Sequence, residues 1–220
     1  MSNVWLYKKD FDDIGDAIRE KLDTETEYTI EDMASAINSI SFDEKKFLDR
    51  TITTFNDNNI TTIGDYAFSN CTSLITINLP NATNINYRAF YYCTSLTSIN
   101  LPNVITIDNS AFSNCTSLTS VNVPSVTKLK GAYAFSNCSS LTSITLPSIT
   151  SIEYSAFSYC TSLTSVILPG STICSLDISV FLNTPIESGT GYIYVPANLV
   201  DSYKSATNWS EYANRIVAIS

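Results

Sequence analysis

One phrase of 22 to 23 residues is repeated along the middle of this chain. "SNCTSLTSVNVP" begins at Ser113, and close copies begin at Ser69, Tyr91, Ser136 and Ser158. Five cysteines follow the same register, at separations of 22, 22, 23 and 22 residues: Cys71, Cys93, Cys115, Cys138 and Cys160. A unit this short cannot bury an apolar face alone. Repeats of this period therefore stack into a solenoid, in which each coil covers its neighbours.

Each copy also carries the same internal pattern of apolar residues. Leu96-x-x-Ile99-x-Leu101 matches the L-x-x-L-x-L consensus of leucine-rich solenoids, and Pro102 follows it at once. Because proline has no N–H for a sheet ladder, each short strand should end close to this position. A second apolar pair and an Ala-Phe dipeptide complete the unit. The pattern predicts a β-rich solenoid of short parallel strands with Leu, Ile, Phe and Cys columns inside.

The solenoid is predicted to extend beyond the clean copies at both ends. Ile52, Phe55 and Ile60 lie 22 residues before their counterparts in the first clean copy, and Phe181 continues the Phe column. "YIYVP", from Tyr192, supplies a strand, while "NTPIESGTG" before it is expected to be a long loop. The predicted solenoid covers residues 46–196, with a degenerate first coil at about 46–62, regular coils over 63–172 and a degenerate last coil over 173–196.

The two ends of the chain differ from the repeats. Residues 1–45 contain two amphipathic stretches with apolar side chains at helical spacing, which predicts an α-helical hairpin that attaches to a partner or caps the solenoid. Residues 197–220 predict an α/β cap with a helix over 198–206 and a final strand over 216–219. Tyr203, Trp209 and Tyr212 are expected to cover the last coil.

Composition excludes several classes of function. The chain has 12 basic and 21 acidic residues, a net charge of −9, so a nucleic-acid partner is not expected. It has no histidine, which excludes Ser-His-Asp and Cys-His catalysis. No run of apolar residues is long enough for a membrane span, so membrane insertion is not expected. The start "MSNVWLYKKDF" lacks the pattern of a secretory signal, which predicts a cytoplasmic protein until assembly or lysis.

The repeat resembles a known family. The unit "AFSNCTSLTSVNVP" is similar to the BspA-like leucine-rich repeats of bacteria, and the likeness covers residues 52 to about 196. "FDDIGDAIREKLDTETEYTIEDMASAINSI" resembles an N-terminal domain of tail-associated proteins in phages and prophages of Gram-positive gut bacteria. "YIYVPANLVDSYKSATNWSEYANRI" resembles the C-terminal cap of the same proteins. The resemblance implies a right-handed solenoid used for adhesion or partner binding, with no shared catalytic residues.

These likenesses give two expected functions, neither of them enzymatic. In the first, the chain is a phage or prophage tail component. Its hairpin binds other virion proteins, its solenoid presents a face to a protein or glycan at a host surface, and it ends in the virion. In the second, it is an extracellular bacterial adhesin of the BspA-like type that binds host or matrix components. No cofactor or metal is expected, because the cysteines lack the close pairs of zinc sites and should be buried free thiols.

One candidate binding surface is the outer face of the main strands. Residues between the buried positions of a strand point outward, where they form neutral columns of hydroxyls and amides. Such a face could bind a glycan or a polar protein surface, or it could simply be a solvated sheet surface. Its residues are Thr76, Ser98, Ser120, Ser143, Ser165, Asn78, Asn100, Asn122 and Thr145.

A second candidate surface is an edge rich in tyrosine. Tyr91 replaces a serine of the other copies, Tyr92 and Tyr159 replace an asparagine, and Tyr66, Tyr87, Tyr133 and Tyr154 lie just before the Ala-Phe dipeptide. Exposed aromatic side chains are favoured at binding sites, but they also fill turns as partly buried residues. The candidate aromatic edge consists of Tyr87, Tyr91, Tyr92, Tyr154 and Tyr159.

An enzymatic alternative would depend on the few carboxylates of the solenoid. Asp65 and Asp108 lie near the start of equivalent turns but two coils apart, roughly 10 Å by strand spacing. Glycosidases use carboxyl pairs at a comparable separation, although the pattern predicts no cleft. Loss of turnover on altering either residue would be needed to support this alternative.

Overall fold

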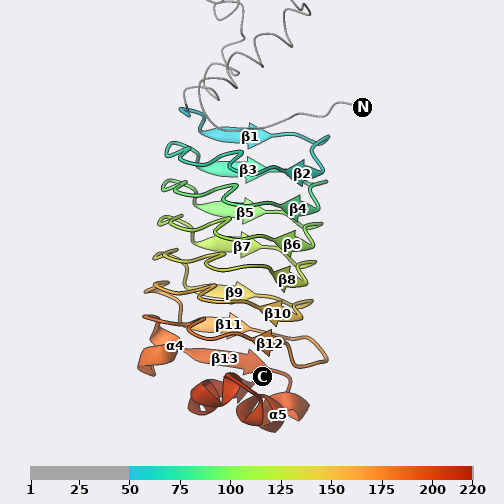
Figure 1. Cartoon of the computed structure of the whole chain (residues 1–220), viewed down its shortest axis with the longest axis vertical. Coiled ribbons are helices and arrows are strands. Elements are labelled where there is room, and N and C mark those ends of the chain that lie inside the picture. Colours follow the sequence, from blue (N-terminus) through green and yellow to red (C-terminus); the bar gives the residue numbers. More distant parts are fainter. Residues whose placement is uncertain (1–49, 220) are drawn as a thin grey trace, which may run out of the picture.

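The computed structural model describes residues 50–219 and shows a solenoid of stacked coils (Figure 1). The predicted hairpin over 1–45 lies outside these residues. Each coil contributes a three-residue strand to one column of parallel strands: β1 (Thr54–Asn56), β3 (Thr76–Asn78), β5 (Ser98–Asn100), β7 (Ser120–Asn122), β9 (Ser143–Thr145) and β11 (Ser165–Ile167).

A second column of strands forms the other wall of the solenoid. Each of its strands has only two residues, and together they make one six-stranded parallel sheet: β2 (Thr62–Ile63), β4 (Asn84–Ile85), β6 (Thr106–Ile107), β8 (Lys128–Leu129), β10 (Ser151–Ile152) and β12 (Ser175–Leu176). The predicted parallel-stranded solenoid is therefore confirmed. The degenerate first coil is also present, because β1 pairs with β3 and Phe55 lies opposite Ile77.

The phenylalanine column runs through the centre of the solenoid. Neighbouring rings from Phe68 to Phe157 lie nearly parallel, with centroids 4.9 to 5.6 Å apart. Phe181 continues the stack at 6.0 Å, as the sequence predicts. The rings are fully buried. Because the ring separation is close to the spacing of hydrogen-bonded strands, one aromatic residue per coil fills the interior without a gap.

The cysteine column lies beside the phenylalanines and has a polar role as well. All six cysteines are free and buried, which agrees with the prediction of free thiols. The thiol of Cys93 donates to the carbonyl oxygen of Phe68 in the preceding coil at 2.9 Å, and Cys160 makes the same contact with Phe135 at 3.0 Å. Cys115 and Cys138 repeat it. The cysteines are thus hydrogen-bond donors between coils and not only apolar fillers.

The main column of strands is interrupted once. It divides into a sheet of β1, β3, β5 and β7 and a second sheet that starts at β9, and no ladder joins β7 to β9. The break lies across a 23-residue repeat, since β7 and β9 begin 23 residues apart, at Ser120 and Ser143, and Gly131 between them has a positive φ of 77°. Val121 of β7 is partly exposed, whereas Ile99 and Ile144 in the adjacent coils are buried. We call this break the seam; the regular repeat pattern does not predict it.

The C-terminal end closes the solenoid with mixed elements. A short helix α4 (Pro185–Ser188) lies where the sequence suggests only a loop, because Thr184 caps it and Pro185 starts it. Strand β13 (Tyr192–Val195) follows and pairs with β11. The chain then forms η1 (Ala197–Leu199), α5 (Val200–Ser205), η2 (Trp209–Arg215) and β14 (Ile216–Ala218). Because β14 pairs with β13 in parallel, the cap continues the main sheet.

Aromatic side chains of the cap cover the last coil. Trp209 and Tyr203 are almost completely buried, and Trp209 lies 6.4 Å from Phe181 between ring centroids. The Trp209 indole N–H donates to the carbonyl oxygen of Cys174 at 2.8 Å, and Tyr212 packs edge-on against Phe181. Trp209 and Tyr212 thus lie against Phe181, the last ring of the phenylalanine column.

Candidate functional site

The residues of the candidate polar strand face are exposed or partly exposed on the main strands. The two outward columns lie on adjacent parallel strands, where Thr76 is opposite Ser98 and Asn78 is opposite Asn100. The Asn122 side-chain amide donates to the Asn100 side-chain oxygen at 2.6 Å. The seam separates Ser120 from Ser143, so each column is divided into two parts. On this face, the side-chain amides of Asn100 and Asn122 therefore bind one another.

On the tyrosine edge, tyrosine rings from neighbouring coils pack in pairs. Rings of Tyr66 and Tyr87 pack edge to face with centroids 5.2 Å apart, and rings of Tyr133 and Tyr154 pack in the same way at 5.6 Å. Desolvation, together with the interaction between the two phenols of each pair, raises the pKa of Tyr87 and that of Tyr133. The candidate Tyr87 is therefore paired with Tyr66, and the candidate Tyr154 is paired with Tyr133.

The tyrosine pairs belong to two equivalent groups. We call Tyr66, Tyr87 and Tyr92 the N-terminal tyrosine group and Tyr133, Tyr154 and Tyr159 the C-terminal tyrosine group. Each member of the second group lies 67 residues after its counterpart (66 to 133, 87 to 154, 92 to 159). The two groups therefore occupy the same positions of coils that are three repeats apart, about 14 Å from the spacing of stacked strands.

Four of these tyrosines have a backbone conformation that tyrosine rarely adopts. Tyr66, Tyr92, Tyr133 and Tyr159 have φ between 58° and 63°, in the left-handed region. The positions equivalent to Tyr92 and Tyr159 hold asparagine, which tolerates this region better. Tyr92 and Tyr159 are nevertheless 41% and 49% exposed, so burial does not compensate for the strain. The equivalent residues of the other coils also have a positive φ, so the repeated turn imposes this conformation on the tyrosines.

Arg88 lies within the N-terminal tyrosine group. Its guanidinium carbon is 5.0 Å from the ring centroid of Tyr87 and 4.7 Å from that of Tyr91, and Tyr91 packs against Tyr92 at 4.6 Å. The C-terminal tyrosine group has Ser155 and Ser158 at the positions of Arg88 and Tyr91. The sequence-based candidates omitted Arg88, Tyr66 and Tyr133; the 67-residue equivalence could have identified the two tyrosines.

The carboxylates of the solenoid accept local backbone hydrogen bonds. Asp65 accepts from the backbone N–H of Tyr87 at 3.2 Å, and Asp108 accepts from Asn109 at 2.7 Å. Asp108 also pairs with Lys130 at 3.8 Å. The side chains of Asp65 and Asp108 thus make their contacts in separate turns.

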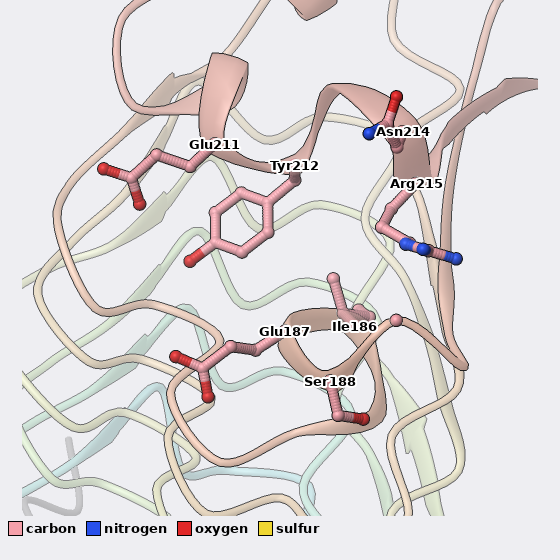
Figure 2. Close-up of a pocket in the computed structure, with 8 residues that line it drawn as sticks. Ile186, Glu187, Ser188, Glu211, Tyr212, Asn214 and Arg215 are labelled. Carbon is pink, nitrogen blue, oxygen red and sulfur yellow. The ribbon is translucent and has the colours of Figure 1, made fainter.

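A shallow pocket lies at the C-terminal end between α4 and η2 (Figure 2). It has a volume of about 410 Å³, and its lining includes Glu187, Glu211 and Arg215. Glu187 accepts from the backbone N–H of Asn183 at 2.6 Å, and the Arg215 guanidinium lies 5.8 Å from the ring centroid of Tyr192. Two of the charged residues are therefore used in packing the cap.

The buried thiols have little nucleophilic character. Burial raises the pKa of Cys71 and that of Cys174 to about 11, and it also raises the pKa of Cys115, Cys93 and Cys138. Within residues 50–219, no group of three or more His, Cys, Asp or Glu residues is arranged to hold a metal ion. In the same range, no helix is long and apolar enough to cross a membrane.

Comparisons with known proteins agree with this architecture. The chain is similar to a T. pallidum leucine-rich repeat protein of known structure, with 24% identity, a TM-score of 0.50, and coverage of 60% of this chain and 77% of that one. A leucine-rich repeat protein from Bacteroides ovatus is 22% identical over 64% of this chain, with a TM-score of 0.46. The present chain spans about half (47%) of that protein.

No curated protein matches the chain. A family match, in contrast, covers most of it. The family described as "BspA type Leucine rich repeat region" matches this chain in three overlapping segments, residues 11–103, 35–129 and 83–200, with six copies of the repeat. Together with the stacked parallel strands, this match establishes the family: the chain belongs to the BspA-type leucine-rich repeat proteins.

Proposed function

We propose that this protein is a non-catalytic recognition module that binds a protein partner along its tyrosine edge. The observation that carries the proposal is the pair of equivalent tyrosine groups, exposed and three coils apart. Tyrosine is enriched at protein interfaces, because its ring supplies contact area and its hydroxyl supplies a hydrogen bond. Family membership supports the same class of role, since repeat solenoids present extended binding surfaces.

The backbone strain at the edge favours binding over simple turn filling. A left-handed conformation costs an L-residue roughly 1–2 kcal/mol, and asparagine or glycine adopts it more easily. Asn70, Asn114 and Asn137 occupy the position of Tyr92 in other coils. A tyrosine that only filled space would be expected to be buried. The rings of Tyr92 and Tyr159 are instead 41% and 49% exposed.

The spacing of the two groups favours an extended partner. One group can bind a single side chain or short segment, whereas two groups about 14 Å apart can be spanned by a few residues of extended chain. Binding at the second group then becomes intramolecular, which raises the affinity without a new kind of contact.

The biological setting is a further part of this proposal. The likeness of residues 11–40 and of the C-terminal cap to phage and prophage tail proteins supports a tail component whose N-terminal segment binds other virion proteins. The BspA-type repeats themselves support the alternative, a bacterial surface adhesin. Neighbouring genes for tail, baseplate or lysis proteins would favour the first, and detection on intact, non-lysing cells would favour the second.

The binding proposal can be tested with a displayed random-peptide library selected on the full chain. Variants that restore the residues of other coils should fold: Tyr66→Ser and Tyr92→Asn in one group, Tyr133→Ser and Tyr159→Asn in the other. We expect selected peptides to lose at least tenfold in affinity for either double variant, because tyrosines at interface centres contribute strongly. Changes on the strand face, such as Ser98→Asn, are the matched control. Peptides that respond only to the strand-face change would contradict the proposal.

A further inference from the structure

One cation of the tyrosine edge has no anionic partner in the described part of the chain. The Arg88 guanidinium lies near the rings of Tyr87 and Tyr91, and no carboxylate of residues 50–219 forms an ion pair with it. The nearest coils do contain carboxylates. Asp65 accepts from the Tyr87 backbone, and Asp108 pairs with Lys130, so these two side chains are already engaged.

The side-chain hydrogen-bond donors of Arg88 also have no partner in the described part of the chain, although its backbone N–H donates to Asn109. Its Nε atom is buried and has no hydrogen-bond partner, while the side chain as a whole is partly exposed. A buried donor without a partner costs free energy, and a charged donor costs more than a neutral one. The rings of Tyr87 and Tyr91 hold the guanidinium in place through cation–π contacts. The N–H groups point outward in the plane of the guanidinium, so these contacts do not use them.

The shape of this arrangement selects the chemistry of its ligand. A guanidinium presents parallel N–H donors that match the two oxygens of a carboxylate, and such paired hydrogen bonds are among the strongest in proteins. Contact with the rings of Tyr87 and Tyr91 shields part of the guanidinium from solvent, which strengthens its electrostatic interactions. Arginine and tyrosine together are also the residues that dominate protein–protein hot spots. These features favour an acidic segment of a protein.

We propose that Arg88 binds an Asp or Glu carboxylate of the protein partner at the N-terminal tyrosine group. The inference rests on the proposed function and makes the two groups unequal. The N-terminal group takes an acidic side chain, and the C-terminal group, with Ser155 at the position of Arg88, takes a neutral one. The partner therefore binds in one direction along the solenoid.

The test uses the peptides selected on the full chain and two charge-removing variants. Arg88→Gln removes the guanidinium, and Lys128→Gln removes an exposed cation of β8 as the matched control. We expect the selected peptides to be enriched in Asp or Glu. Their affinity should fall roughly 10- to 100-fold on Arg88→Gln and stay unchanged on Lys128→Gln. Replacing the peptide carboxylate by its amide should cost the same on the original chain and nothing more on Arg88→Gln.

The other outcomes separate this inference from the function on which it rests. Peptides that depend on the tyrosines but carry no carboxylate, and that bind Arg88→Gln equally well, would overturn the role of Arg88 alone. Peptides that depend on neither would overturn both proposals. A heparin oligosaccharide that binds through Arg88, in the absence of acidic peptides that do so, would replace the acidic protein by an anionic glycan. Thermal unfolding of each variant shows whether it is folded.

Discussion

At the scale of single residues, the tyrosine edge has features that lower the stability of the fold but suit the proposed binding. Tyr92 and Tyr159 keep a left-handed backbone and expose their rings, although asparagine occupies the same position in most coils. Strain of this kind persists only where the surrounding structure imposes it, and here the neighbouring coils fix the turn.

Replacing these tyrosines by asparagine should stabilise the fold. We expect Tyr92→Asn and Tyr159→Asn each to raise the free energy of unfolding by about 1 kcal/mol, because asparagine adopts the left-handed region at lower cost. Chemical denaturation measures the change. Tyr91→Ser is the control, since Tyr91 has an ordinary φ and its equivalents are serine, so it should not stabilise. A loss of stability in both asparagine variants would show that the rings pack usefully.

The buried thiols should make the fold sensitive to alkaline pH. Their ordinary pKa is 9.0, and burial raises that of Cys71 and Cys174 to about 11 and that of Cys115 as well. The unfolded chain then releases protons that the folded chain keeps, so stability is complete below pH 9 and falls as the pH rises further. We expect a loss on the order of 1 kcal/mol per thiol per pH unit above 9.

A cysteine variant provides the control for this pH dependence. Cys115→Ala should cost about 1–2 kcal/mol at neutral pH, because it removes a buried sulfur and its bond to the carbonyl of Phe90. It should also make the alkaline loss of stability less steep. An unchanged slope would assign the pH dependence to groups other than this thiol.

At the scale of elements, the seam distinguishes two sheets that the repeats alone would predict as one. The backbone N–H groups of Thr164 and Ser165 donate to the carbonyl oxygen of Thr142 at 2.9 and 3.2 Å. Between β7 and β9, no corresponding bond joins Thr142 or Ser143 to Thr119 within the described chain. The seam is thus a local loss of ladder hydrogen bonds, while the six-stranded sheet continues beside it.

Hydrogen exchange should detect the seam directly. We expect the amide hydrogens of Thr142 and Ser143 to exchange at least tenfold faster than those of Thr164 and Ser165, which occupy equivalent positions one coil later. Amide-resolved exchange measured by NMR gives both pairs in one sample. Equal protection would indicate that β7 and β9 pair in solution.

Sequence patterns predict the regular coils well and the irregular features poorly. The strand positions, the Phe column and the first coil follow from one residue type repeated in register, because each such residue must fill the same interior site. The helix α4 escaped prediction because its cap, Thr184-Pro185, lies in a short polar segment. Arg88 escaped because its significance depends on the rings of Tyr87 and Tyr91 around it, which only the folded chain brings together.

At the scale of the whole molecule, the stack depends on the cover at its ends. Ring stacking continues from coil to coil until Phe181, where Trp209 and Tyr212 replace the next phenylalanine. Each coil contacts only its neighbours, so loss of a terminal cover exposes the next coil and unfolding can proceed from that end.

Removal of the tryptophan should weaken the entire solenoid. We expect Trp209→Ala to lower the free energy of unfolding by about 3–5 kcal/mol, because the buried indole and its bond to Cys174 are both lost. Calorimetry gives the magnitude. Replacement of Ile178, which is more than half exposed on the last coil, by alanine serves as the control and should change little. A small effect of Trp209→Ala would mean that the cap does not secure the stack.

The position of the seam has a mechanical consequence. The tyrosine groups lie on opposite sides of it, since Tyr92 precedes β7 and Tyr159 follows β9. A slight bend at the seam would change the distance between the two tyrosine groups while the phenylalanine column stayed intact. The two groups would then accommodate partners of different length. Lengthening or shortening the coil at the seam would set a new distance between them.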